Sequence, residues 1–152
     1  GEALALTLND IDFEQHIVSI NKTYYRIVGK DLINPPKTAG SERTILMPDF
    51  LTAELLDYVG HLYEPAPDDR IFNKRPQYVR SILRDRAKKA GVKQIRVHDL
   101  RHSHASMLIN LGANPLLVAE RLGHESPAIT LKTYSHLFPS TQNDIVSKIK
   151  KI

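Results

Sequence analysis

Side chains able to act on a phosphodiester gather in one stretch, RVHDLRHSHASMLINLGANPLLVAERLGHESPAITLKTYSH, which spans residues 96–136. This stretch contains five of the chain's seven histidines. Three kinds of site use histidine, arginine and tyrosine in this way: a metal site, a nucleic-acid-binding surface, and a site for phosphoryl transfer without a metal.

A metal site is the least favoured of the three. His98 and His102 are four positions apart, a spacing that can bind zinc on one helix face. The HExxH arrangement is absent, because HDLRH has no glutamate at the required position. Arg101 lies between the two histidines and would repel a cation. We therefore expect no bound metal and no cofactor.

Metal-free phosphoryl transfer has a candidate of each type that it requires. Attack on a phosphodiester builds negative charge on the nonbridging oxygens, and arginine stabilises that charge with paired donors. Histidine can move a proton, lysine can protonate a leaving oxygen, and a tyrosine hydroxyl can hold the phosphate as an ester. The candidates are Lys37, His98, Arg101, His124 and Tyr134. Each of these residues taken alone also has a structural explanation. Their order and spacing must therefore distinguish a catalytic site from structural residues.

The charge distribution favours a nucleic-acid partner. Residues 1–69 carry 5 Lys and Arg against 12 Asp and Glu, whereas residues 70–101 carry 11 against 2. A basic block this dense usually faces an anion, and double-stranded DNA is the leading candidate. The alternative is a solvated basic helix face. The candidate phosphate contacts are Arg75, Arg80, Arg84, Lys88 and Arg96.

The elements that must position these residues are mostly helical. Apolar residues at three-and-four spacing predict helices over residues 49–64 and 75–92. Asp99 is a candidate N-cap for a helix to Leu111. The pairs Asn114-Pro115 and Ser126-Pro127 each begin a further helix, the second of which carries Tyr134. Residues 141–152 close the chain as an amphipathic helix.

The first part of the chain is rich in β-forming residues. Residues 16–25 predict a strand, and residues 24–48 continue an antiparallel meander with a tight turn near residues 37–41. The expected fold class is α+β, mostly α-helical, with a small three-stranded antiparallel sheet near the N-terminus. The sequence contains no run of about 18 apolar residues, so it predicts no membrane-spanning helix. The absence of cysteine excludes disulfides and thiolate metal sites and fits a reducing cytoplasm.

Two motifs give the chain a family resemblance. HDLRHSHAS followed by LGHESPAITLKTY closely resembles the C-terminal catalytic domain of the tyrosine recombinases, the phage-integrase family. His98 and Arg101 fit the family's His-x-x-Arg motif, His124 ends its Leu-Gly-His motif, and Tyr134 lies ten positions further on. PPKTAGSERTILMP resembles the hairpin that carries the family's lysine, which assigns that role to Lys37.

The same resemblance predicts a longer protein. GEALALTLNDID resembles the stretch after the family's first catalytic arginine, which would lie two positions before Gly1. We therefore expect residues 1–152 to be an N-terminally truncated catalytic domain, without upstream core-binding and arm-binding domains and impaired by the missing arginine. Integrases of phages, genomic islands and conjugative elements are the expected relatives.

The resemblance implies a site-specific DNA recombinase. Tyr134 would attack the scissile phosphate and form a 3′-phosphotyrosine, with Arg101 and His124 on the phosphate oxygens. His98 would assist proton transfer at the nucleophile, and Lys37 would protonate the leaving 5′ oxygen. The family also implies a homotetramer on DNA, with residues 141–152 docked on a neighbouring subunit, in the bacterial cytoplasm at the nucleoid.

Three other functions use similar features. A type IB topoisomerase shares this set of side chains but relaxes DNA without a partner duplex. A DNA-binding module without chemistry would explain the helix-turn-helix spacing of SMLINLGANPLLVAERLGHES. A metal-dependent nuclease would be silenced by EDTA.

Overall fold

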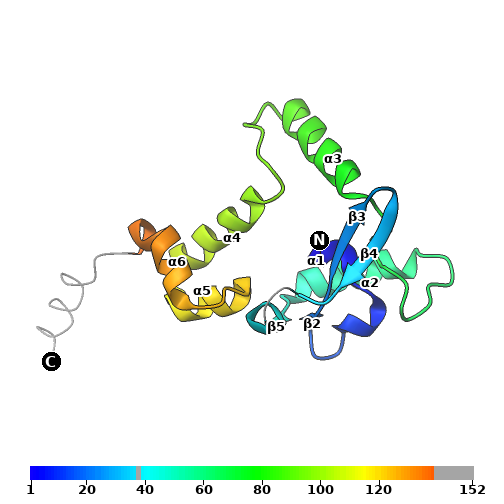
Figure 1. Cartoon of the computed structure of the whole chain (residues 1–152), viewed down its shortest axis with the longest axis horizontal. Helices are drawn as coiled ribbons and strands as arrows, with labels where there is room; N and C mark the ends of the chain where they lie inside the picture. The colour runs from blue at the N-terminus through cyan, green and yellow to red at the C-terminus, as the bar shows by residue number, and fades with distance from the viewer. Residues whose placement is uncertain (37–38, 139–152) are drawn as a thin grey trace, which may run out of the picture.

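The fold divides into two groups of elements (Figure 1). The structure is a computed structural model, and it describes residues 1–36 and 39–138. One group holds the strands with α1 (Glu2–Ala5) and α2 (Asp49–Gly60), and α3 (Pro76–Lys89) extends from it. The other group holds α4 (Asp99–Asn110), α5 (Pro115–Leu122) and α6 (Pro127–Tyr134).

The strands form two small antiparallel sheets. In the first, β1 (Ile11–Asp12), β2 (Ile17–Ile20) and β5 (Arg43–Leu46) pair in the order β1-β2-β5. In the second, β3 (Thr23–Ile27) pairs with β4 (Lys30–Asn34). The predicted α+β class with a three-stranded antiparallel sheet is confirmed.

The predicted strand order is wrong in two respects. Residues 16–25 do not form one strand, because the chain leaves β2 at Asn21 and Lys22 and enters the other sheet. The ammonium of Lys22 holds this break by an ion pair of 2.6 Å with Asp10. The predicted meander also fails, because β5 returns to pair with β2 and β4 stays with β3.

The helices of the first group pack on the sheets in small clusters. Leu4 and Ala5 of α1 are buried with Tyr24 of β3, and Val18, Ile20 and Met47 form a second cluster. Helix α3 buries little of the apolar face that its sequence predicts. Its buried residue is Ala87, and Ile82 of the same face is 39% exposed.

The second group is built from the capping signals that the sequence contains. The side chain of Asn114 accepts a hydrogen bond of 2.9 Å from the backbone of Leu117, as an N-cap does. Gly123 ends α5 in the left-handed conformation, with φ of +68°. The predicted start of this helix at Asn114-Pro115 is confirmed.

Asp99 is not the N-cap that the sequence predicts. It is the first residue of α4, and His98 takes the cap position. The Asp99 carboxylate accepts bonds from the backbone and the guanidinium of Arg96 instead. It therefore closes the turn that leads into the helix.

Lys37 and the predicted helix over residues 141–152 lie outside the described residues. Within residues 1–36 and 39–138, none of the helices combines the length and apolar composition that a membrane span requires. A short 3-10 turn (Ser135–Leu137) follows α6.

Candidate active site

The tyrosine at the end of α6 lies inside the core formed by α4, α5 and α6. Tyr134 is 4% exposed and packs with Ala105, Ile109, Val118 and Leu122. Its hydroxyl lies 2.6 Å from Nδ1 of His102. Burial raises the pKa of Tyr134 above that of a free tyrosine, and the positive charge of Arg101 opposes that rise.

The rings of two histidines lie near this hydroxyl, His102 of α4 and His98 at the N-cap of that helix. The ring of His102 lies 5.8 Å from the ring of Tyr134 and 5.1 Å from the ring of His98, which it meets edge to face. His98 was predicted to serve the nucleophile, yet the structure places His102 between them. His102 was missed as a functional residue because its partner is 32 positions away. The signals in the sequence were its place beside Arg101 and its spacing of four positions from His98.

Arg101 connects α4 to the end of α5. Its Nη2 donates to the backbone carbonyl of Leu122, the first residue of the Leu-Gly-His motif. Burial lowers the pKa of Arg101, and so does the charge of Arg43, while Glu2 raises it. The guanidinium is therefore partly desolvated, which strengthens its attraction for an anion.

His124 follows the left-handed Gly123 and turns back toward α6. Its Nδ1 lies 2.8 Å from Oγ1 of Thr130, a fully buried residue. Burial lowers the pKa of His124, and the charges of Arg101 and Arg43 lower it further. His124 is therefore held in one orientation and favoured in its neutral form.

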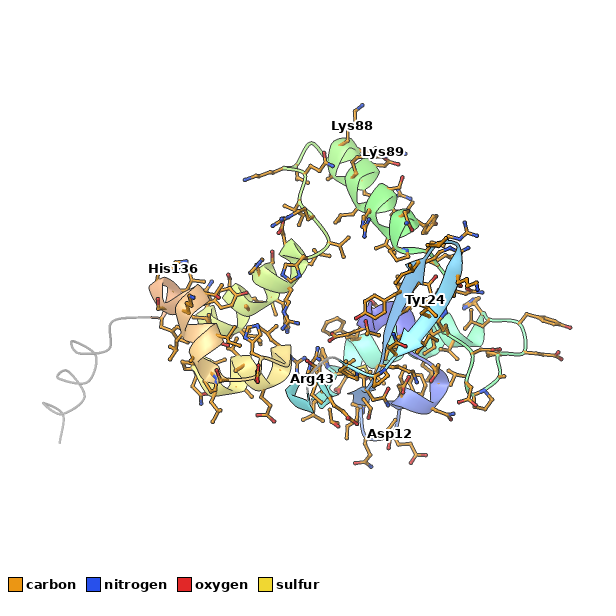
Figure 2. The ribbon with its side chains drawn as sticks, viewed as in Figure 1. Asp12, Tyr24, Arg43, Lys88, Lys89 and His136 are labelled. Carbon is orange, nitrogen blue, oxygen red and sulfur yellow. The ribbon has the colours of Figure 1, made fainter. Side chains whose placement is uncertain are left out.

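A residue outside the predicted set joins the two groups of elements. Arg43 of β5 donates to both carboxylate oxygens of Glu2, at 3.1 and 2.9 Å. It also donates to the carbonyl of Ser41 at 2.9 Å and to that of Arg121 at 3.0 Å. We call these contacts the Arg43 clamp, and Figure 2 shows Arg43 where the sheet meets the helices.

The clamp also affects the ionisation of Glu2 and the space beside Gly123. Burial opposes ionisation of Glu2, but the hydrogen bonds and charge of Arg43 outweigh it and hold the pKa of Glu2 below its usual value. The Arg43 guanidinium also lies against Gly123, where an added Cβ would meet Nη1 at 2.8 Å. The clamp was missed because its partners are 41 and 78 positions away in sequence.

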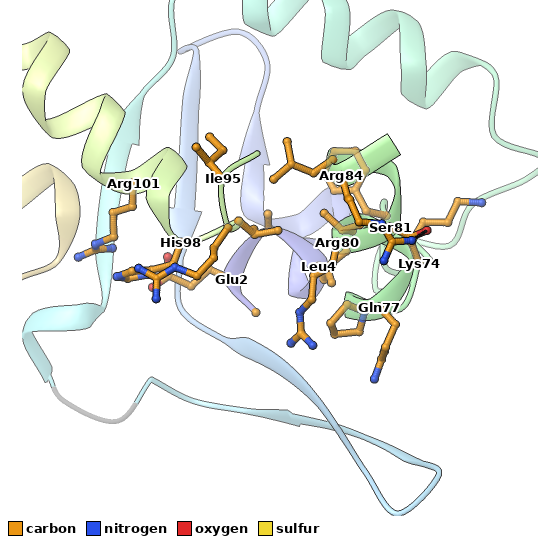
Figure 3. Close-up of a pocket in the computed structure, with 18 of the residues that line it drawn as sticks. Glu2, Leu4, Lys74, Gln77, Arg80, Ser81, Arg84, Ile95, His98 and Arg101 are labelled. Carbon is orange, nitrogen blue, oxygen red and sulfur yellow. Dashed lines mark hydrogen bonds between the residues drawn. The ribbon is translucent and has the colours of Figure 1, made fainter. Parts of the chain in front are cut away.

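Part of the predicted basic surface lines a cavity beside Arg101 (Figure 3). Arg101, His98 and Glu2 lie on one side of it, and Arg80 and Arg84 of α3 lie on the other. Arg96 also lines the cavity and pairs with Asp99 at 2.9 Å. That pair lowers the pKa of Asp99 to about 2.

Two members of the predicted basic surface do not line this cavity. Arg75 is the exposed N-cap of α3, and Lys88 projects from the far end of that helix (Figure 2). No group of three histidine, aspartate or glutamate side chains in the described part of the chain is arranged to hold a metal ion.

Comparisons with known proteins support the family resemblance. The model of the phage integrase family matches residues 1–141. The ICEBs1 integrase of Bacillus subtilis is 29% identical over 98% of this chain and 44% of its own length. The integrase of Staphylococcus phage L54a is 27% identical over 100% of this chain and 48% of its own length. The chain thus spans about half the length of these curated relatives.

Solved structures show the same fold. The Tn1549 transposon integrase, in complex with transposon right end DNA, matches 99% of this chain and 53% of its own, with a TM-score of 0.80 and 21% identity. The catalytic domain of bacteriophage HP1 integrase matches 96% and 71%, with a TM-score of 0.62 and 23% identity. Fold and family model agree, and this chain belongs to the phage integrase family.

Proposed function

We propose that this chain carries out site-specific DNA recombination through a covalent tyrosine intermediate. The observation that carries the proposal is the hydroxyl of Tyr134, which a histidine of α4 meets at 2.6 Å within reach of the charge of Arg101. A tyrosine held only by core packing does not need such neighbours. The relatives named as integrases support the same reading.

The proposed reaction needs no energy source besides the DNA. The Tyr134 hydroxyl gives up its proton to a neighbouring histidine as its oxygen attacks the scissile phosphorus. An O–P bond forms, and the bond to the 5′ oxygen breaks. Lys37 supplies the proton to the leaving 5′ oxygen, and Arg101 and His124 stabilise the charge on the nonbridging oxygens. A 5′ hydroxyl of a second duplex then attacks the phosphotyrosine and restores the backbone.

The partner we propose is double-stranded DNA from the ends of a mobile genetic element. Arg80, Arg84 and Arg96 line the cavity beside Arg101, where phosphate contacts would position a duplex without reading its sequence. The Tn1549 integrase was solved with transposon DNA, which supports this partner.

The proposed assembly is larger than this chain. We propose that residues 1–152 are the catalytic domain of a longer recombinase, since its relatives are about twice as long. By its family, it works as a homotetramer on DNA at the bacterial nucleoid, with residues 141–152 docked on a neighbouring subunit.

A nicked suicide duplex tests the chemistry. The full-length protein, with any sequence that precedes Gly1, is incubated in EDTA with a nicked duplex from its element's end. We expect a protein–DNA band on a denaturing gel for the wild type and none for Tyr134→Phe. A band that persists in Tyr134→Phe would refute the assignment of the nucleophile. Relaxation of supercoiled DNA without strand exchange would favour a topoisomerase.

A further inference from the structure

The hydroxyl of the nucleophile has a specific hydrogen-bond partner in this structure. Nδ1 of His102 lies 2.6 Å from the Tyr134 hydroxyl oxygen, a short distance for a hydrogen bond between nitrogen and oxygen. Tyr134 is 4% exposed, so bulk water has little access to its side chain. Among the described residues, His102 is the hydrogen-bond partner recorded for this hydroxyl.

A buried phenol needs a base before it can attack. Burial raises the pKa of Tyr134, which disfavours the phenolate that would react with phosphorus. Arg101 favours the phenolate through its charge but cannot accept a proton, because a guanidinium stays protonated in proteins. Nδ1 of His124 is engaged by Thr130 instead.

His98 is less well placed for this task. It is the N-cap residue of α4, and its recorded ring contact is with His102, at 5.1 Å between centroids. His102 lies one helical turn further along α4, on the side that meets α6. The geometry therefore separates the histidine of the His-x-x-Arg motif from the histidine that touches the reacting oxygen.

We propose that His102 is the catalytic base that removes the phenolic proton of Tyr134. The proposal rests on the proposed function and names a residue outside its predicted set. As the Tyr134 oxygen bonds to phosphorus, its O–H bond breaks and the proton moves to Nδ1 of His102. The 5′ oxygen leaves with the electron pair of its bond to phosphorus and takes a proton from Lys37.

Several ionisable and aromatic side chains lie around His102. Asp99 lies one turn before it on α4 and interacts with it electrostatically. His98 contacts it from the N-cap of α4, and Tyr134 contacts it from α6. The charge of His102 also lowers the pKa of His124, which follows α5. Asp99 stays ionised, because its pKa is about 2. An ionised carboxylate therefore lies within one helical turn of the proposed base.

Two substitutions separate a base from a structural contact. His102→Asn places an amide oxygen near the position of Nδ1, so it keeps a hydrogen bond but cannot take the proton. His102→Ala removes both. His104→Asn is the matched control, because His104 lies on the same helix and its Nε2 accepts from Arg121 at 3.2 Å. Duplex binding and circular dichroism show whether each variant folds.

The substrate design locates the defect at the nucleophile. One suicide duplex carries the normal 5′ oxygen at the scissile bond, and a second carries sulfur, whose thiolate leaves without a proton. We expect both His102 variants to form the covalent complex about 100-fold or more slowly on both duplexes, a loss typical of general acid–base catalysis. Sulfur should rescue Lys37→Ala, since that variant lacks only the acid.

Three results would overturn the proposal. They are near-normal cleavage by folded His102→Ala, near-normal cleavage by His102→Asn, and rescue of either variant by the sulfur substrate. A measurement on the wild type does not depend on the folding of variants. Nitrogen-15 NMR should show His102 in its neutral form with the proton on Nε2, and a proton on Nδ1 would contradict the acceptor role. Loss of the covalent band in Tyr134→Phe tests the proposed function separately.

Discussion

Replacing Gly123 by alanine tests whether the Arg43 clamp holds the end of α5. Gly123 has φ of +68°, and an added Cβ would lie 2.8 Å from Nη1 of Arg43, 3.1 Å from Cζ and 3.2 Å from Cδ. The end of an arginine side chain normally moves aside at little cost. Here its side chain is 9% exposed, and four hydrogen bonds hold it.

The expected loss of stability has two parts. The left-handed conformation costs a residue with a Cβ roughly 1–2 kcal/mol. Displacing Arg43 disturbs hydrogen bonds to a carboxylate, which are worth roughly 1.5–3 kcal/mol each. We therefore expect Gly123→Ala to lower the free energy of unfolding by about 2.5–5 kcal/mol, the sum of the strain and one such bond.

Gly91 supplies the matched control. Its φ is +65°, and an added Cβ would meet nothing within 4 Å. Gly91→Ala should therefore cost only the strain, roughly 1–2 kcal/mol. Denaturant unfolding followed by circular dichroism measures both losses. In an Arg43→Ala background, the loss of stability caused by Gly123→Ala should fall to the loss caused by Gly91→Ala. Equal losses for both glycines in the wild type would refute the clamp.

Three further predictions concern the helices, the site and the basic surface. Asn114→Ala should cost about 1 kcal/mol in denaturant unfolding, because it removes an N-cap acceptor; a loss below about 0.3 kcal/mol would contradict this. The pKa of His124 is lowered on folding, so the unfolded chain binds more protons and stability falls as the pH drops through about 6.5. The His124→Asn variant should lose less stability over this pH range. An unchanged loss of stability would contradict the role given to His124. Arg80→Ala and Arg84→Ala should each reduce the salt slope of duplex binding by about one, whereas Lys88→Ala, outside the cavity, should change it less; equal effects would contradict this placement.

The parts of the fold that could be predicted depend on neighbours in sequence. Asn114 caps α5 through a residue three positions away, and Gly123 ends the helix through its own backbone conformation. Such signals are complete within a few residues. The strands were harder, because pairing of β5 with β2 rather than β4 is decided by tertiary contacts. The alternation of residues 16–25 does not reveal the break that Lys22 and Asp10 hold.

The site follows the same division. Residues of the two motifs could be named from their spacing, which the family resemblance supplied. Their contacts could not, because His102 meets Tyr134 across 32 positions and Arg43 meets Arg121 across 78. Asp99 shows the reverse error, since a local rule made it an N-cap while Arg96 took its carboxylate. Long-range hydrogen bonds determine which histidine touches the nucleophile.

The burial of Tyr134 protects it from reagents dissolved in water. A nitrating reagent modifies tyrosines that solvent reaches, such as Tyr63, which is 90% exposed, and meets little of a side chain that is 4% exposed. Modification at position 134 then requires α6 to separate from α4 and α5, since those helices supply its cover. Nitrotyrosine at this position, compared with that at Tyr63, would measure how often the helix leaves the core.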